Sequence, residues 1–230
     1  MPFLFYEIKG FLILLPALIL AFYAQYKVQS TFKRYLRVSS RGGYTGVQTA
    51  RRILDSQGLR DVPIDMIGGH LTDHYDPRKK ILRLSQEVYR GSSVASIGVA
   101  AHEAGHAIQH ANGYTPLSIR NAIVPVAGFS SRISFFLIFL GLFMGATAMV
   151  DIGIYLFLAV VIFQLITLPV EFNASSRAIE LLVGEGLING DEEKGVRKVL
   201  SAASLTYVAA AATAIAQFLR LLTLRNRRRR

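Results

Sequence analysis

His102, Glu103 and His106 are the residues whose types and spacing are best suited to chemistry, because they form an H-E-x-x-H pattern. Residues four apart on an α-helix lie one above the other on the same face, so the imidazoles of His102 and His106 can bind one metal ion. Zinc suits this pair, and Glu103 would lie beside it, where a carboxylate can take a proton from water. The pattern therefore predicts a zinc site with Glu103 as general base. The alternative is a chance match on a helix.

Apolar and small residues surround the motif, as expected of a buried helix. They are Val94, Ala95, Ile97, Val99, Ala100, Ala101, Ala104, Ala107 and Ile108. Buried imidazoles and carboxylates are costly in free energy unless they have partners, and a metal ion supplies one. Gly105 lowers helix stability compared with alanine, a loss that is tolerated where another backbone passes close by. We therefore expect Gly105 to have a packing role.

The third zinc ligand must come from outside the motif. The chain has no cysteine, so the ligand must be a His, Asp or Glu side chain. His110 would lie about 12 Å from His102 along a straight helix, which is too far for the same ion. Gln109 and Asn112 stand where the metzincin pattern needs glycine and histidine, which excludes that class.

Glu171 is the best candidate for this ligand, with Glu180 and Glu185 as fallbacks. Glu171 directly follows an apolar run and is expected at the start of a helix, and a carboxylate at a membrane surface is costly unless it has a role. Two other interpretations are a glutamate favoured by the helix dipole and an ion pair with Arg177. For Glu171 considered alone, either of these interpretations would be preferred to a metal-binding role. The zinc motif lacks a third ligand, however, and this favours Glu171 as that ligand.

The segments before the motif predict a small α/β element. Residues 46–58 have the apolar periodicity of an amphipathic helix that packs on the motif helix. Residues 62–67 and 81–85 alternate in hydrophobicity and predict strands. Asp73–Lys80 contains Asp-Pro and predicts a turn between them. A short helix at 86–89 precedes the motif helix, whose N-cap is Ser92 or Ser93.

Apolar residues occur in blocks long enough to cross a membrane. The chain is 52% hydrophobic and its mean hydropathy is +0.37. Residues 11–24, together with the apolar residues 2–6 and interrupted only by Glu7 and Lys9, are long enough to span a membrane. They predict an N-terminal anchor rather than a signal peptide, since no basic region precedes the run and no cleavage site follows it. The runs 135–150 and 154–170 predict a membrane hairpin, with Asp151 and Gly153 between them.

Three further segments have weaker sequence patterns than these apolar blocks. Residues 121–134 predict an interfacial segment that leads into the hairpin, and residues 181–200, with an acidic turn, predict a soluble segment. Residues 205–224 predict a last apolar helix, and the pattern leaves open whether it crosses the membrane.

Basic residues are clustered and give the chain a net charge of +11. Eight lie between Lys27 and Arg60 with only Asp55 against them, which by the positive-inside bias predicts that this side is cytoplasmic. The chain ends in an arginine-rich tail, residues 225–230. If residues 205–224 crossed the membrane, the tail would lie opposite the first cluster and one of them would violate the bias. Basic residues beside apolar helices bind anionic lipid or set topology more often than they bind nucleic acid, so we expect no nucleic-acid partner.

Three blocks of the chain resemble the membrane-bound neutral zinc metallopeptidases of the YugP type. These blocks are Leu71–Lys80, Ala100–Gln109 and Glu171–Ala178. More distantly, the chain is similar to the HtpX-type heat-shock proteases and the CAAX prenyl proteases, which place a membrane hairpin between the zinc helix and a downstream glutamate ligand. The resemblance covers nearly the whole chain. It implies a bacterial, multi-pass plasma-membrane peptidase with one Zn²⁺ per chain, and it supports Glu171 as the ligand.

One residue departs from the distant relatives. They have an aspartate four residues after the glutamate ligand, and this chain has Ser175 there. Asn173, Ser175 or a backbone carbonyl would then orient the zinc-binding histidines.

The resemblance also implies a mode of substrate binding. In such proteases an edge strand ahead of the zinc helix binds the substrate backbone by strand addition, which here implies residues 79–84. His74, Tyr75 and Arg177 are candidates for contact with substrate or oxyanion. The alternative for His74 is a solvated turn residue.

These observations predict a mainly α, integral membrane, zincin-like metallopeptidase with a small β element over the zinc helix. Its substrates would be unfolded or membrane proteins and peptides, and its active site would face the cytoplasm. The competing hypothesis is a membrane scaffold or adaptor with a structural zinc site and no turnover. We expect one integrated catalytic unit built from five segments, 1–26, 27–134, 135–170, 171–204 and 205–230.

Overall fold

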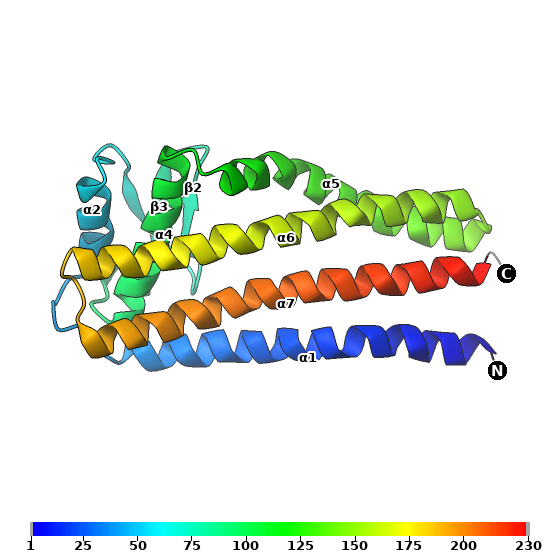
Figure 1. Cartoon of the computed structure of the whole chain (residues 1–230), viewed down its shortest axis with the longest axis horizontal. Coiled ribbons are helices and arrows are strands. Elements are labelled where there is room, and N and C mark those ends of the chain that lie inside the picture. The colour runs from blue at the N-terminus through cyan, green and yellow to red at the C-terminus, as the bar shows by residue number, and fades with distance from the viewer. Residues whose placement is uncertain (1, 229–230) are drawn as a thin grey trace. The chain divides into compact units, whose positions relative to one another are not determined.

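The computed structural model describes residues 2–228 of the chain, and side chains from Gly10 to Arg225. The chain forms two compact units. Figure 1 shows the helices and strands in their order along the chain. The α/β unit comprises Tyr26–Leu117 and Val170–Leu205, and the helical unit comprises Met1–Gln25, Ser118–Pro169 and Thr206–Arg230.

Helix α4, Val94–Ala111, is the centre of the α/β unit and carries the motif. Ser93 is its N-cap and accepts a hydrogen bond from the Ser96 backbone N–H, which satisfies one of the donors left open at a helix start. Helix α2, Gly46–Ser56, packs against α4 as predicted. Thr45 and Gln48 form a capping box at the start of α2, so the local sequence fixes where this helix begins.

A three-stranded sheet lies before α4 in the chain and has the order β1-β3-β2. Strand β1, Ile64–Ile67, pairs in parallel with β3, Ile81–Ser85, and β2, His74–Asp76, pairs antiparallel with β3. The two predicted strands are confirmed. The predicted turn at Asp73–Lys80 is shorter than expected, because its first part forms β2.

The central position of β3 contradicts the implied substrate-binding role of residues 79–84. Strand addition needs an unpaired edge, and β3 is paired on both sides. Leu82 and Leu84 of β3 are fully buried, so their role is to form the core. The edges of this sheet are β1 and β2.

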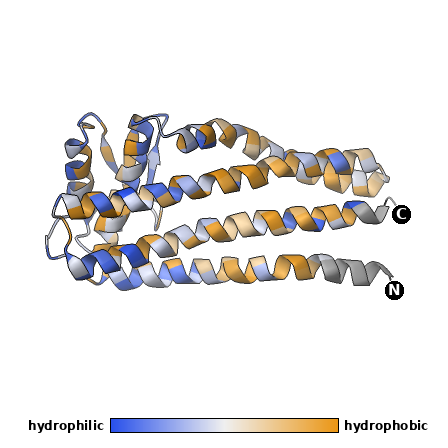
Figure 2. Cartoon of the chain, viewed as in Figure 1, coloured by the Kyte–Doolittle hydropathy of each residue, from blue (hydrophilic) through white to orange (hydrophobic). Residues whose placement is uncertain are grey.

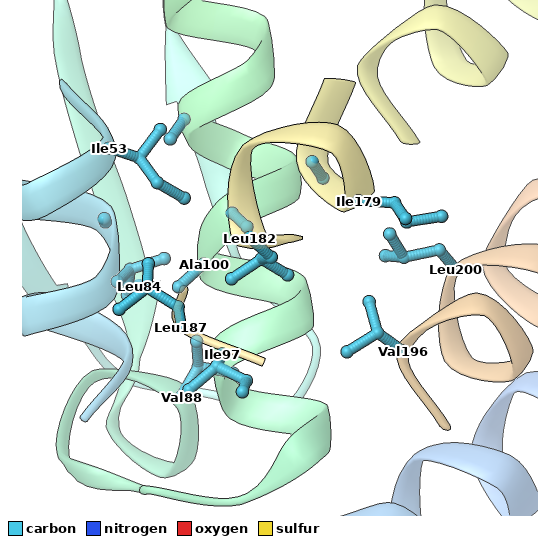
Figure 3. Close-up of a cluster of buried hydrophobic side chains, with 14 of the residues drawn as sticks. Ile53, Leu84, Val88, Ile97, Ala100, Ile179, Leu182, Leu187, Val196 and Leu200 are labelled. Carbon is cyan, nitrogen blue, oxygen red and sulfur yellow. The ribbon is translucent and has the colours of Figure 1, made fainter. Parts of the chain in front are cut away.

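The hydrophobic core of the α/β unit joins segments that are far apart in the sequence (Figure 3). Ile53 of α2, Leu84 of β3 and Ile97 of α4 meet residues from the C-terminal part of α6, Thr147–Gly184, and from the first part of α7, Gly190–Arg228. These later residues include Ile179, Leu182, Val196 and Leu200. The short helix α3, Gln86–Arg90, adds Val88. Burial of these side chains therefore fixes residues 170–205 against the motif helix.

Helices α5, Thr115–Met144, and α6 form the hairpin of the helical unit. The hairpin was predicted, but its turn was placed wrongly at Asp151 and Gly153. The turn lies at Gly145, whose φ of +71° is readily adopted only by glycine. Gly153 lies inside α6, where a Cβ would be 2.6 Å from the Ile138 side chain, so it allows the two helices to approach closely.

Several predicted boundaries inside the long helices are absent from the structure. Residues 121–134 belong to the continuous helix α5. Glu171 does not start a helix, because α6 continues through Pro169. The predicted segment 181–200 is divided between the end of α6 at Gly184 and the start of α7 at Gly190, and residues 205–224 continue α7, which runs to Arg228. The hydropathy changes along these helices, but no helix-breaking pair of residues interrupts them at these positions.

Within residues 2–228, four helices are long and apolar enough to cross a membrane. They are α1, Pro2–Leu36, followed by α5, α6 and α7. Colouring by hydropathy shows that α1 and α7 each have an apolar part and a hydrophilic part (Figure 2). In the helical unit, Arg225 near the end of α7 forms an ion pair with Asp151 of α6, and a Cβ on Gly10 of α1 would lie 3.4 Å from Cγ of Arg220.

Candidate metal centre

The two motif histidines and Glu171 converge in the α/β unit. His102 and His106 lie on one face of α4, with ring centroids 4.8 Å apart and ring planes at 83°. The Nε2 atoms of His102 and His106 lie 3.3 Å and 3.5 Å from Oε2 of Glu171. Potential ligand atoms of the three residues all lie within 4.8 Å of one another. The structure thus brings together the three residues that the sequence analysis put forward as ligands.

The donor set fits zinc. Zinc takes nitrogen and oxygen ligands at about 2.0–2.2 Å in a tetrahedron, which places neighbouring ligand atoms roughly 3.3 Å apart. The nitrogen to oxygen distances of 3.3 Å and 3.5 Å match that spacing. Among the described residues, this group of His, Cys, Asp and Glu side chains has three members. Three protein ligands are typical of catalytic zinc sites, whereas structural sites commonly have four.

Gln109 orients His106. The Gln109 amide nitrogen donates to the backbone carbonyl of Val170 at 2.8 Å and to Oδ1 of Asn173 at 2.9 Å. Its Oε1 is therefore the atom that accepts from Nδ1–H of His106, at 3.0 Å. This hydrogen bond leaves the Nε2 lone pair of His106 directed at Glu171 and available to a metal ion. Gln109 is fully buried, so these contacts are shielded from water.

Ser175 orients His102. Its hydroxyl lies 3.2 Å from Nδ1 of His102 and 3.5 Å from the Ser204 hydroxyl. If Ser175 accepts from Nδ1–H, the Nε2 lone pair of His102 is left for the metal, as at His106. The group that contacts Nδ1 of His102 is thus a neutral hydroxyl. Ser175 lies one turn after Glu171 on the same helix, which explains how one segment supplies both groups.

Glu171 also affects the proton affinity of His106. Burial of the imidazole lowers its pKa, but the hydrogen bond to Glu171 and the charges of Glu103 and Glu171 raise it, and the pKa of His106 lies above its ordinary value. A metal ion must therefore compete with a proton for Nε2.

Glu103 is buried on α4 and is held by the neighbouring strand. Its Oε2 accepts a hydrogen bond from the backbone N–H of Tyr75 in β2, at 3.0 Å. Because a strand backbone has little freedom to move, this contact fixes the orientation of the carboxylate. The start of β2 is fixed in turn by Asp73, whose Oδ1 accepts from the backbone N–H and hydroxyl of Ser85. Burial raises the pKa of Asp73.

The candidates for substrate or oxyanion contact have other partners. His74 is exposed, and its Nδ1 lies 2.8 Å from the Thr72 carbonyl. The Tyr75 hydroxyl lies 2.9 Å from Nδ1 of His110. Arg177 donates to Asn173 at 2.8 Å and so belongs to the hydrogen-bond network around Gln109.

The two fallback glutamates lie outside the metal centre. Glu180 is exposed, and Glu185 forms an ion pair with Arg52 at 3.5 Å. Neither is a member of the group formed by His102, His106 and Glu171.

Sequence reasoning missed Gln109 and the backbone of Tyr75. Gln109 carried a signal, because it is a polar residue three positions after His106 in an otherwise apolar helix. Tyr75 carried none, because its contribution is a backbone N–H that any residue type would supply.

Comparison with known proteins also indicates a zinc site in this chain. Residues 10–226 match the model of a family described as "Putative neutral zinc metallopeptidase". The chain is 53% identical over 204 residues to the "Putative membrane protease YugP" of Bacillus subtilis (strain 168), which covers 89% of this chain and 91% of that protein. No solved structure matches significantly.

Proposed function

Because the chain belongs to this family of zinc metallopeptidases, we propose that it is a membrane-bound zinc metalloendopeptidase that cleaves peptide bonds with Glu103 as general base. One observation carries the proposal. The Nε2 atoms of His102 and His106 converge on the Glu171 carboxylate at ligand spacing, while Gln109 and Ser175 contact the opposite ring nitrogens. This arrangement suits one Zn²⁺ per chain with three protein ligands.

Different residues of the site would have different roles in peptide-bond hydrolysis. His102, His106 and Glu171 would hold the ion, which when bound supplies a Lewis acid for the scissile carbonyl and lowers the pKa of water. The buried carboxylate of Glu103 would take a proton from the attacking water and pass it to the nitrogen of the leaving amine. The Tyr75 N–H would hold one oxygen of Glu103 and leave the other for proton transfer.

Unfolded or membrane proteins and peptides are the proposed substrates, and the bacterial plasma membrane is the proposed location. Four helices of membrane-spanning length and composition support membrane insertion. The basic cluster between Lys27 and Arg60 supports a cytoplasmic active site.

The competing hypothesis is a scaffold with a structural zinc site. It explains neither the three-membered donor set nor the buried Glu103, since a structural site gains nothing from a general base beside the metal. We therefore favour the enzyme.

Glu103→Gln tests the proposal. The full chain in lipid nanodiscs should keep its zinc, because the ligands are unchanged, and cleavage of a fluorescently labelled unfolded protein should fall by roughly 10²–10⁴-fold. The matched control is Glu180→Gln, at an exposed position of α6, which should cleave like wild type. Substrates should also accumulate on the Glu103→Gln protein in membranes. A wild-type protein with full zinc, no cleavage and no accumulated substrate would support the scaffold instead.

A further inference from the structure

A groove between α1 and α7 is a candidate site outside the metal centre. Its volume is about 390 Å³, which lies in the range of roughly 300–1,000 Å³ typical of small-ligand sites. It belongs entirely to the α/β unit, since residues 27–35 of α1 and 197–201 of α7 line it. The two helices touch closely at its side, where a Cβ on Gly195 would lie 2.9 Å from the Tyr35 ring.

The charge of the groove is strongly positive. Lys27, Arg34, Arg197 and Lys198 line it, and no carboxylate does. Glu193 offsets Arg197 through two hydrogen bonds, at 2.8 Å and 2.6 Å, and the other cations of the lining outnumber this one carboxylate. Positive charges that are held close together repel one another, and a bound anion relieves that repulsion.

The other lining groups favour a phosphate as the anion. Thr31, Tyr35 and Ser201 add hydroxyl groups between the cations. Phosphate oxygens accept charge-assisted hydrogen bonds from lysine and arginine, and hydroxyl donors can satisfy the remaining lone pairs.

The place of the groove along both helices indicates where this phosphate comes from. In α1 the apolar run 11–24 ends about one helical turn before Lys27, and in α7 the apolar segment 205–224 begins one turn after Ser201. Figure 2 shows the same change from hydrophobic to hydrophilic along each helix. Tyr26, which is 73% exposed, is an aromatic residue of the kind found at the level of lipid head groups.

We propose that this groove binds the phosphate of one anionic phospholipid. Lys27, Arg34 and Lys198 bind the phosphate oxygens, and Thr31 and Ser201 add hydrogen bonds. The site requires the chain to lie in a membrane but does not depend on the proposed peptidase activity.

The test compares two variants that each remove three positive charges. The groove variant is Lys27→Gln, Arg34→Gln and Lys198→Gln. The control variant is Lys33→Gln, Arg60→Gln and Lys79→Gln, all exposed positions that do not line the groove. Each full-length protein is equilibrated in nanodiscs of phosphatidylcholine and phosphatidylglycerol and extracted in mild detergent. Native mass spectrometry then measures the phosphatidylglycerol that remains bound.

Wild type and the control variant should retain phosphatidylglycerol, and the groove variant should retain at least about tenfold less. Zinc content and melting temperature verify that the variants are folded. Equal loss in both variants would show attraction by net charge alone and would overturn the proposal. Displacement of the lipid by millimolar inorganic phosphate would show that a free phosphate suffices, and would overturn the assignment to a lipid.

Discussion

Glu171 completes the metal centre at the scale of single residues, and its removal gives the sharpest test of the ligand set. Glu171→Ala leaves two histidines, which are too few for tight zinc binding. We expect zinc affinity to fall by more than about 100-fold, beyond the effect usual for residues that only orient a ligand. Competition with a chromogenic chelator measures the loss. Glu180→Ala and Glu185→Ala are the controls, and full zinc occupancy of Glu171→Ala would place the third ligand elsewhere.

Gln109 orients His106 rather than binding the metal, so its substitution should have a smaller effect. Gln109→Met keeps the side-chain volume but removes the acceptor for Nδ1–H of His106. Zinc affinity should fall by about 10–100-fold, with both imidazoles still present. Gln57→Met, at an exposed position after α2, should bind zinc like wild type. An unchanged affinity in Gln109→Met would show that packing alone orients His106.

The sequence predicted part of this site because side-chain chemistry and helical spacing are readable locally. His102, Glu103 and His106 needed only the period of a helix, and Glu171 followed from a missing ligand and a costly position. The hydrogen bond from Tyr75 to Glu103 was not predictable, because it depends on how β2 packs beside α4. The role of Ser175 was one of several alternatives, and only the fold decides among them.

At the scale of elements, Gly105 determines how closely α6 approaches the motif helix. A Cβ at residue 105 would lie 2.9 Å from the carbonyl oxygen and 3.4 Å from Cα of Ala174. This close approach confirms the packing role expected of Gly105. Glu171 and Ser175 flank Ala174, so the contact also sets their distance from α4.

Gly105→Ala should therefore destabilise the protein although alanine favours helices. The gain in helix propensity is at most about 1 kcal/mol, and a backbone shift at Ala174 should cost more than that and also weaken zinc binding. Gly184→Ala is the control, because a Cβ at this last residue of α6 meets nothing within 4 Å. Thermal unfolding of zinc-free protein, with a zinc titration alongside, distinguishes the two. A higher melting temperature for Gly105→Ala would contradict the close approach.

Burial of Asp73, whose carboxylate links the start of β2 to Ser85 at the end of β3, should give a pH-dependent stability. The pKa of Asp73 is raised in the folded chain from 3.8, so the ionised form is disfavoured by folding. As the pH falls through the pKa that Asp73 has in the folded chain toward 3.8, the folded state binds a proton before the unfolded state does. The folded state therefore gains stability relative to the unfolded state. Asp73→Asn lacks this gain. The unfolding free energy of wild type minus that of Asp73→Asn, measured without zinc, should therefore rise as pH falls. A constant or falling difference would refute the raised pKa.

Element boundaries were less predictable than element types, and the hairpin shows why. Asp151 and Gly153 look like a turn because they interrupt an apolar run, yet Asp151 pairs with Arg225 and Gly153 packs against Ile138. Both features depend on contacts distant in sequence. Strand β2 was missed for a related reason, since its three residues have no apolar alternation of their own.

At the scale of the whole molecule, two observations about membrane topology favour opposite sides of the membrane for the arginine-rich tail. The positive-inside bias puts the cluster between Lys27 and Arg60 in the cytoplasm and also favours the cytoplasm for the arginine-rich tail. However, α7 has the length and composition of a membrane span, and within the helical unit Arg225 pairs with Asp151, close to the Gly145 turn. A tail that is paired near the hairpin turn lies on the same side as that turn.

We expect the ion pair and the apolar length of α7 to prevail over the charge of the tail. The eight basic residues after the first span would then set the orientation, and the hairpin turn and the tail would both lie outside. Because the chain has no cysteine, single cysteines at Ser39, Thr147 and Asn226 can be labelled in intact cells with a membrane-impermeant thiol reagent. Ser39 and Thr147 are exposed, and Thr147 leaves the pair of Asp151 and Arg225 intact.

Labelling should occur at Thr147 and Asn226 and be absent at Ser39 until the cells are permeabilised. The physical reason is that α6 and α7 each cross the apolar layer once from the side of the zinc site, so their far ends emerge together. Labelling at Ser39 with protection at Thr147 would reverse the orientation and place the zinc site outside. Labelling at Thr147 with protection at Asn226 would mean that α7 does not cross the membrane, and it would also be incompatible with the ion pair between Asp151 and Arg225.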